Sequence, residues 1–204
     1  MHSEKNISAQ PSVIHELESI LERFDLERLF PTHQPLEVEL GSGDGTFLRD
    51  YARRHPERNF IAVERLLGRL RKIDRKARTA SLANVSAIRI ESAYFLEFLL
   101  PKQSAAALHI YFPDPWPKKK HRRHRLINER FPSLARSVLS IAGIVYLRTD
   151  DADYFDQMQS VFSASEWFDR VETPEELSSL TTDFENEFNA RGIATLRAAY
   201  RRRS

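Results

Sequence analysis

The strongest constraint on the fold is an alternation, from residue 36 onwards, of short strand-like segments with longer helix-like ones. Stretches whose apolar residues recur at helical spacing separate segments rich in β-branched and aromatic residues. The strand-like segments are Leu36–Leu40, Asn59–Val63, Val85–Ile90, Ala105–Phe112, Gly143–Arg148, Trp167–Glu172 and Gly192–Tyr200. This alternation predicts an α/β fold with a mostly parallel sheet of seven strands and helices on both faces.

The remaining segments predict the helices and the domain boundaries. Helices are expected over Pro11–Phe30, Thr46–Arg54, Leu66–Ala80, Tyr94–Leu100, a basic segment ending near Ile141, and Ala152–Phe162. A chain of 204 residues is long enough for one domain with its own core. We expect a flexible segment over 1–10, a single domain over 11–200 and a basic tail over 201–204.

The composition excludes several classes of protein. The chain has no cysteine, which excludes disulfides and thiolate metal sites. No apolar run approaches the length needed to cross a bilayer, and residues 1–10 lack a signal-peptide pattern. The simplest interpretation is a cytoplasmic protein without a membrane partner.

Polar residues stand at the carboxyl ends of the predicted strands. In a parallel α/β sheet, ligands bind beyond this edge. The residues that fall there are Glu39, Glu64, Ser92, Asp114 and Asp150. We therefore expect the functional site to be built from these positions.

The turn Gly41-Ser42-Gly43-Asp44-Gly45 predicts a nucleoside-type cofactor site. Its three glycines permit a tight turn and a close approach of a ligand to the backbone. Glu39 disfavours a pyrophosphate and suits the sulfonium or amino group of S-adenosylmethionine, with Asp44 adding negative charge, while Glu64 can accept hydrogen bonds from both ribose hydroxyls. A plain strand-to-helix turn stays open as an alternative, and the GxGxG spacing disfavours NAD.

The most specific stretch is the loop and basic run Phe112–Arg125, which reads FPDPWPKKKHRRHR. Three prolines in five residues stiffen the loop and hold Asp114 and Trp116 with little conformational freedom. From Lys118 to Arg136 there are eight Lys or Arg and one acid. Such a run suits the phosphates of RNA, although a solvated helix face is the commoner fate of charge runs.

In this order, the motifs resemble those of the bacterial tRNA (guanine-N7)-methyltransferases. The resemblance rests on VELGSGDG, IAVER, PDPWPKKKHRRHR, LRTDD and TDFENEFNARG, and it runs from about Pro35 to Arg197. It implies a Rossmann-like class I fold, S-adenosylmethionine as cofactor and tRNA as partner. It also implies methylation of a guanine at N7, at position 46 of the tRNA variable loop. The oligomeric state, monomer or homodimer, stays open.

The resemblance also assigns roles to residues. Asp114 is implied to be catalytic and to border the cofactor. The cofactor-binding residues are implied to be Glu39, Gly41, Gly43, Glu64 and Ser92, together with Asp114. The substrate-binding residues are implied to be Lys118, Asp150, Thr182, Asp183, Phe184 and Glu185. The family usually has a carboxylate where Ser92 stands, so Ser92 is expected to hold the adenine amino group more weakly; Glu91, one place earlier, is expected on the strand and facing the other way.

The implied reaction needs alignment more than proton transfer. Guanine N7 has an in-plane lone pair and no proton to remove, so Asp114 is expected to stabilise the positive charge that develops on the base. Because RNA helices hide N7, the guanine must be drawn out, and Phe184 or Trp116 can stack on it. Three alternatives stay open: an RNA-binding protein without catalysis, a methyltransferase on another acceptor and a nucleotide-dependent oxidoreductase. A metal at His121 and His124 is not expected.

Overall fold

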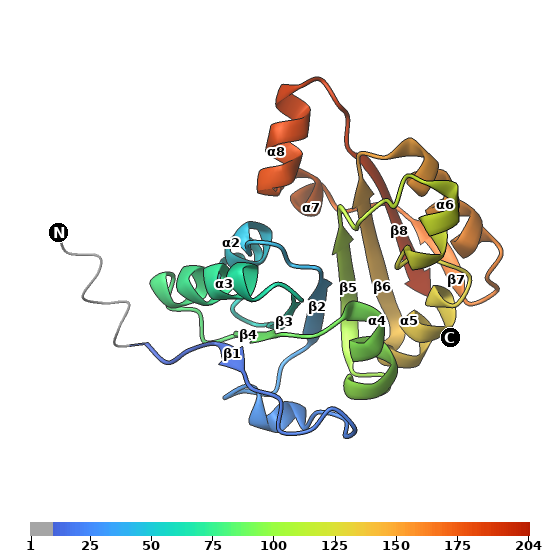
Figure 1. The fold of residues 1–204 in the computed structure, drawn as a ribbon. Coiled ribbons are helices and arrows are strands. Elements are labelled where there is room, and N and C mark those ends of the chain that lie inside the picture. Colours follow the sequence, from blue (N-terminus) through green and yellow to red (C-terminus); the bar gives the residue numbers. More distant parts are fainter. Residues whose placement is uncertain (1–9) are drawn as a thin grey trace. The chain divides into compact units, whose positions relative to one another are not determined.

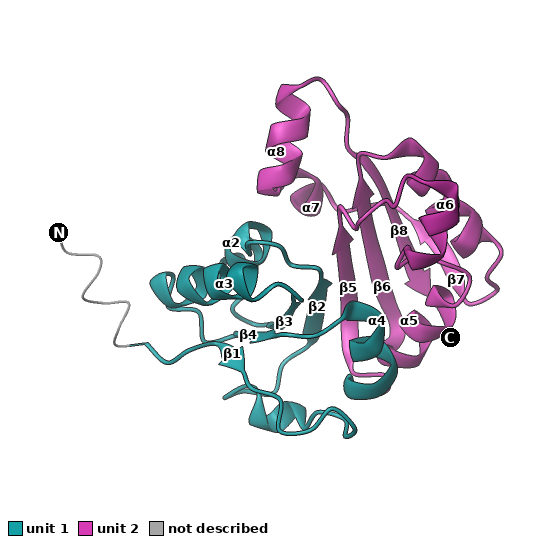
Figure 2. Cartoon of the chain, in the orientation of Figure 1, with its two compact units in different colours: residues 1–101 teal, residues 102–204 magenta. Residues whose placement is uncertain are grey.

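The computed structural model describes residues 10–204, so almost all of the expected flexible segment 1–10 lies outside the described residues. The chain divides into two compact units, residues 1–101 and 102–204 (Figure 2). The single domain expected over 11–200 stays a prediction. Each unit contains one part of the predicted site, and each is described by itself.

Unit 1 is built on a parallel sheet (Figure 1). Its strands lie in the order β1 (Ile14–His15), β4 (Val85–Ile88), β3 (Asn59–Val63) and β2 (Leu36–Leu40). All three pairings are parallel, and each residue of β2 pairs with one of β3. Every residue of β2, β3 and β4 is buried, as expected for strands covered on both faces.

Two amphipathic helices pack beside this sheet. They are α2 (Thr46–Arg54) and α3 (Leu67–Thr79). Their apolar faces are buried, through Phe47, Leu48 and Tyr51 of α2 and Leu70 and Ile73 of α3. The chain then forms α4 (Ser92–Tyr94) and one π-helical turn, η2 (Phe95–Leu99), within or beside the helix expected over Tyr94–Leu100.

The helix expected over Pro11–Phe30 is wrong. This segment contains only the edge strand β1 and a short 3₁₀ helix, η1 (Leu26–Arg28). Tertiary contacts hold this segment instead: Asp74 accepts hydrogen bonds from the Ser12 hydroxyl and from the backbone N–H of Val13. Leu21 is 83% exposed, so not all of the apolar residues at helical spacing in this segment pack into a core.

Unit 2 has a mixed sheet. Its strands lie in the order β5 (Ala105–Tyr111), β6 (Leu139–Thr149), β8 (Leu196–Arg202) and β7 (Phe168–Val171). β5 and β6 are parallel, whereas β8 is antiparallel to both β6 and β7. Arg201 and Arg202 belong to β8, and Arg203 pairs with Asp169 at 2.6 Å, so these residues of the expected basic tail are held in place.

The helices of unit 2 differ more from the sequence prediction. They are η3 (Lys119–His124), α5 (Phe131–Val138), α6 (Ala152–Ser163), α7 (Glu175–Ser179) and α8 (Asp183–Ala190). The basic helix expected to end near Ile141 is instead the 3₁₀ helix η3, a loop and α5, and Ile141 lies in β6. α7 and α8 were not predicted, because their apolar residues are few.

Among the described residues there are eight strands, one more than predicted, and β1 is the additional one. The other seven strands are those that the sequence predicted, and they are confirmed. The ends of several of them differ from the predicted ends by a few residues. In the same part of the chain, no helix combines the length and the apolar character that a membrane span requires.

Candidate functional site

The glycine turn after β2 has the backbone that only glycine adopts readily. Gly41, Gly43 and Gly45 have φ values of +77°, +57° and +79°. A Cβ added at Gly41 would meet no atom within 4 Å, whereas one at Gly45 would lie 2.8 Å from Cγ1 of Ile73. Gly41 therefore borders open space that a ligand can fill, and Gly45 permits the close packing of α2 on α3.

Two buried carboxylates flank this turn. Glu39 is the penultimate residue of β2 and Glu64 directly follows β3; they are 3% and 5% exposed. Glu64 accepts hydrogen bonds from the backbone N–H of Gly43 at 3.0 Å and of Leu66 at 2.8 Å. Because a carboxylate has about four lone-pair sites, Glu64 can still accept hydrogen bonds from a ligand.

The structure corrects the contribution expected from Asp44. Its carboxylate lies 2.5 Å from Nζ of Lys76 on α3, and Lys76 also donates to Thr46. The paired ammonium offsets the negative charge of Asp44. The negative field at the turn therefore comes from Glu39 and Glu64.

Ser92 lies beyond the strand end where the sequence placed it. It is the first residue of α4, four residues after β4 ends, and it is half-buried. The expectation that Glu91 lies on the strand is wrong: Glu91 caps α4, and its two carboxylate oxygens accept hydrogen bonds from Ala93 N at 2.9 Å and Tyr94 N at 2.8 Å. Glu91 is thus engaged by backbone and does not replace the carboxylate that Ser92 lacks.

In unit 2, the proline-rich loop after β5 is tightly turned. Phe112 and Trp116 have φ values of +51° and +43°, which are unusual for residues with side chains. The Asp114 side chain is exposed, and its Oδ1 accepts a hydrogen bond from Trp116 N at 3.3 Å. The loop therefore presents the Asp114 carboxylate to solvent from a constrained backbone.

Arg125 holds this loop in place. It is 1% exposed, and it donates to Pro115 O and to Asp153 Oδ2, both at 2.7 Å. Arg122 donates to the other oxygen of Asp153 at 2.7 Å. The hydrogen bonds from Arg125 and Arg122 lower the pKa of Asp153 below its ordinary value of 3.8. Two cations of the basic run, Arg122 and Arg125, are thus paired with Asp153.

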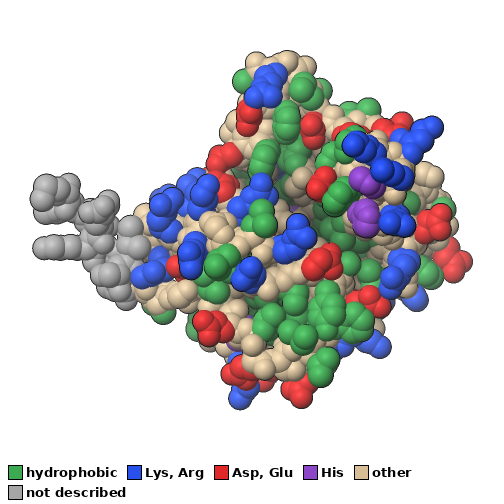
Figure 3. Space-filling model, viewed as in Figure 1, with side chains coloured by type: hydrophobic (Ala, Val, Ile, Leu, Met, Phe, Trp, Pro, Cys, Tyr) green, Lys and Arg blue, Asp and Glu red, His purple; other side chains and the backbone are tan. Residues whose placement is uncertain are grey.

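The other cations of the run face solvent. The exposed side chains are Lys118, Lys119, Lys120 and Arg123. His121 and His124 lie against the Trp116 ring, with centroids 5.9 and 5.1 Å away. Histidine side chains lie among Lys and Arg side chains on the face shown in Figure 3. This surface combines positive charge with aromatic rings, as nucleic-acid sites do.

The late motif begins α8. Thr182 is its N-cap and accepts a hydrogen bond from Glu185 N at 3.0 Å. Asp183 and Phe184 are exposed, Phe184 by 43%. Glu185 is fully buried. The four predicted substrate residues of this motif therefore face in different directions.

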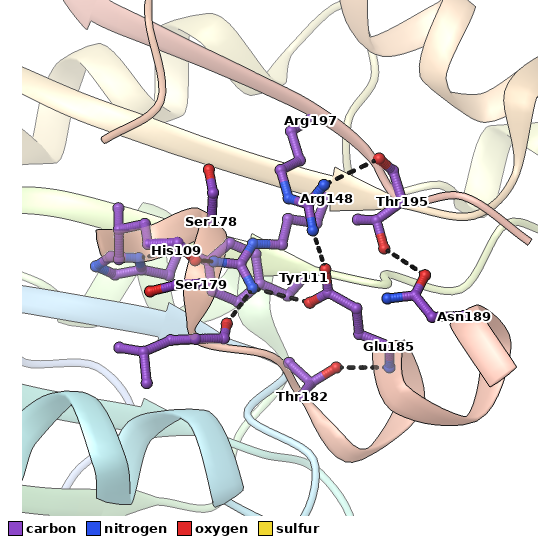
Figure 4. Close-up of polar contacts among 12 residues, drawn as sticks. His109, Tyr111, Arg148, Ser178, Ser179, Thr182, Glu185, Asn189, Thr195 and Arg197 are labelled. Atoms are coloured by element: carbon purple, nitrogen blue, oxygen red, sulfur yellow. Dashed lines mark hydrogen bonds and ion pairs between the residues drawn. The ribbon is translucent and has the colours of Figure 1, made fainter. Parts of the chain in front are cut away.

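Glu185 lies in a buried network that joins α8 to the sheet (Figure 4). One carboxylate oxygen pairs with Arg148 of β6 at 3.0 Å, and the other accepts from Arg197 of β8. Arg148 also donates to the carbonyl oxygens of Leu180, at 2.7 Å, and Leu177. This arginine thus fixes three points of the segment 177–185.

Asp150 directly follows β6 and is half-buried. Its neighbour Asp151 is the N-cap of α6 and accepts a hydrogen bond from Tyr154 N at 2.7 Å. Lys118 and Asp150, like Asp114 and the late motif, lie in unit 2. The residues predicted to bind the cofactor, apart from Asp114, lie in unit 1.

Comparison with known proteins identifies the family. Residues 33–198 match the model of a family described as "Putative methyltransferase". The chain belongs to this methyltransferase family. The match covers both the glycine turn and the late motif, so the family extends over both units.

Named relatives are tRNA (guanine-N(7)-)-methyltransferases. The protein of Nitrosomonas europaea is 34% identical over 76% of this chain and 73% of its own length, and that of Alkalilimnicola ehrlichii is 30% identical over 83% and 71%. The protein of Syntrophotalea carbinolica is 39% identical over 67% of the present chain. The chain spans 59% of the length of the Syntrophotalea relative and 46% of that from Thermotoga maritima.

Solved methyltransferases share the fold. The 16S rRNA methyltransferase KamB aligns with a TM-score of 0.62 at 18% identity, over 90% of this chain and 95% of its own. A structure described as an antibiotic-related methyltransferase has a TM-score of 0.60 at 18% identity, over 95% and 97%. The prediction of an α/β methyltransferase fold is confirmed.

The sequence analysis missed the arginines that organise the site. Arg148 occupies a buried position in a strand that is otherwise largely apolar, and a buried arginine requires an acidic partner. That signal was present in the sequence, but the partner, Glu185, lies 37 residues away. Arg125 was counted as one more cation of the basic run, although only tertiary contacts show that it is buried.

Proposed function

We propose that this methyltransferase transfers a methyl group from S-adenosylmethionine to N7 of a guanine in tRNA. The observation that carries the proposal is the pair of buried carboxylates, Glu39 and Glu64, beside the open space at Gly41. The names of the relatives support the tRNA substrate, and the exposed cations after Pro117 support a polyanionic one.

The residues of unit 1 fit the cofactor. The Glu39 carboxylate suits a cationic group, and Glu64 is placed to accept hydrogen bonds from ribose hydroxyls while it keeps those from Gly43 and Leu66. S-adenosylmethionine supplies a methyl group on a positively charged sulfur. Ser92 remains our candidate for the adenine amino group, with one hydroxyl oxygen in place of a carboxylate.

Asp114 is proposed to act electrostatically. The guanine N7 lone pair needs no general base, and the methylated base is positively charged. An aspartate on a backbone held by Arg125 can stabilise that charge without moving, which is how fixed groups lower a barrier. Asp150 and Lys118 are proposed to contact the tRNA.

We divide the late motif by burial. Exposed Asp183 and Phe184 are proposed to face the substrate, with Phe184 as a stacking surface for the extruded base. The hydroxyl of Thr182 and the carboxylate of Glu185 hold α8 in the structure. Their proposed role is to position the two exposed residues.

Three finer points belong to the proposal. The acceptor guanine is that of the variable loop, position 46 of tRNA, as the resemblance implies. A tRNA substrate places the reaction in the cytoplasm. The active form is proposed to be a monomer or a homodimer.

The test is methyl transfer from labelled S-adenosylmethionine to unmodified bulk tRNA, with identification of the product nucleoside. We expect N7-methylguanosine, and we expect Asp114→Ala to lose most of the activity while it still binds the cofactor. Cofactor binding without transfer to tRNA would refute the activity and favour an RNA-binding role. Transfer to a protein or small molecule instead would show another acceptor.

A further inference from the structure

Helix α3 of unit 1 has a positively charged outer side that none of the preceding roles uses. The α3 basic face consists of Arg71, Lys72 and Arg75, and all three residues are exposed. Figure 3 shows Lys and Arg side chains gathered over this helix. It is a second concentration of charge, separate in sequence from the run that begins at Lys118.

Helical geometry places these cations on one side. Leu70, Ile73 and Ala77 are buried and define the inner side of α3. At 100° per residue, Lys72 and Arg75 point away from it. Arg71, Lys72 and Arg75 therefore lie on the outer half of the helix.

The two acids nearest to this face in the sequence are engaged by other groups. Asp74, the one acid in the segment 65–79, is only partly exposed; it accepts hydrogen bonds from Ser12 and Val13 and pairs with Arg78 at 3.5 Å. Glu64 is buried at the cofactor turn. Asp74 and Glu64 are thus engaged elsewhere.

Such a face costs stability when it is empty. Arg71 and Arg75 are four residues apart, and like charges at this spacing destabilise a helix. Charges that alternate in sign along a helix face are typical of a solvent-exposed helix, and the α3 basic face carries charges of one sign only. The unbalanced charge on α3 therefore points to an anionic ligand.

The spread of the charges favours a polyanion over a single small anion. From Arg71 to Arg75 the helix rises by about 6 Å, and the three positions span about 100° of its outer side. Arginine forks bind phosphate oxygens in pairs. We propose that the α3 basic face binds the sugar-phosphate backbone of the tRNA substrate. This inference rests on the proposed function because it takes tRNA as the ligand.

The test compares two variants of the full chain that lose the same charge. The first is Arg71→Gln/Lys72→Gln/Arg75→Gln, which keeps good helix formers on α3. The matched control is Arg28→Gln/Arg53→Gln/Arg54→Gln, which removes three exposed cations of unit 1 outside α3. Both are assayed for tRNA binding at several salt concentrations, for S-adenosylmethionine binding and for methyl transfer.

The expected effect follows from counterion release. If three phosphate contacts are lost, the slope of log affinity against log salt becomes less steep by about 2–3. The loss of tRNA affinity between 50 and 200 mM salt is then about 16- to 64-fold smaller than in the wild type. Cofactor binding is expected to stay unchanged, and the control variant is expected to keep the wild-type slope.

The outcomes separate this inference from the proposed function. An α3 variant with the wild-type slope and affinity overturns the inference even if the wild type methylates tRNA. Equal losses in the control and the α3 variant show a general charge effect and also overturn it. If the wild type binds tRNA without methylating it and only the α3 variant loses slope, the surface stands and the activity fails.

Discussion

Removing the Arg148 guanidinium should destabilise unit 2 by several kcal/mol. In Arg148→Met, the fully buried Glu185 keeps only Arg197, and the carbonyl oxygens of Leu177 and Leu180 lose their donor. Breaking a buried ion pair on one side costs about 3–5 kcal/mol. For a chain of this size, that lowers the melting temperature by roughly 6–20 °C.

Thermal and urea unfolding, followed by circular dichroism, measure this loss. The matched control is Arg191→Met, which removes an exposed pair with Glu187 on the same helix. That pair joins side chains 62% and 58% exposed, so its loss is expected to cost less than about 1 kcal/mol.

A double variant tests the cause. Arg148→Met/Glu185→Leu removes both buried charges, and the remaining Arg197 side chain, 28% exposed, can turn toward water. We expect it to recover at least half of the stability lost in Arg148→Met. A loss under 1 kcal/mol in the single variant, or no recovery in the double one, would refute the buried network.

Three further predictions concern the site. The pKa of Asp153 is lowered in the folded protein, so its pairing with Arg125 stabilises the loop above pH 3.8, and this stabilisation is lost as the pH falls further. The fluorescence of Trp116 in a Trp167→Phe background should therefore change below pH 3.8, and Asp153→Asn should abolish this pH dependence. Ser92→Asp should tighten S-adenosylmethionine binding about fivefold, because a charge-assisted hydrogen bond gains about 1 kcal/mol over a neutral one; calorimetry that shows unchanged or weaker binding contradicts the role of Ser92. Phe184→Ala should weaken tRNA binding by about 1–3 kcal/mol with cofactor affinity unchanged, and equal tRNA affinity in filter binding would exclude stacking by Phe184.

The sequence predicted best where local pattern and burial agree. β3 and β5 are largely apolar segments, and the glycines of the turn adopt positive φ readily, so both follow from neighbouring residues. The segment 11–30 failed because helical spacing alone does not ensure burial: Ile14 pairs with Ala87 as an edge strand. α7 and α8 were missed because they depend on tertiary contacts with Arg148.

In the candidate site, too, local sequence predicted some features and tertiary contacts determined others. Glu39, Glu64 and Asp114 stand at or just beyond strand ends, where sequence order predicts position. The role of each charge did not follow, since Asp44 is paired with Lys76 and Arg125 is buried against Asp153. Such pairings join residues about thirty positions apart, and no local pattern encodes them.

The central claim is that guanine N7 is the acceptor. It is tested most directly with two tRNA transcripts, one ordinary and one in which 7-deazaguanosine replaces guanosine, so that a carbon stands in place of N7. We predict methyl transfer from labelled S-adenosylmethionine to the ordinary transcript and none to the substituted one, with both transcripts bound equally. Equal transfer to both transcripts would contradict the account, because the methyl group would then go to another atom.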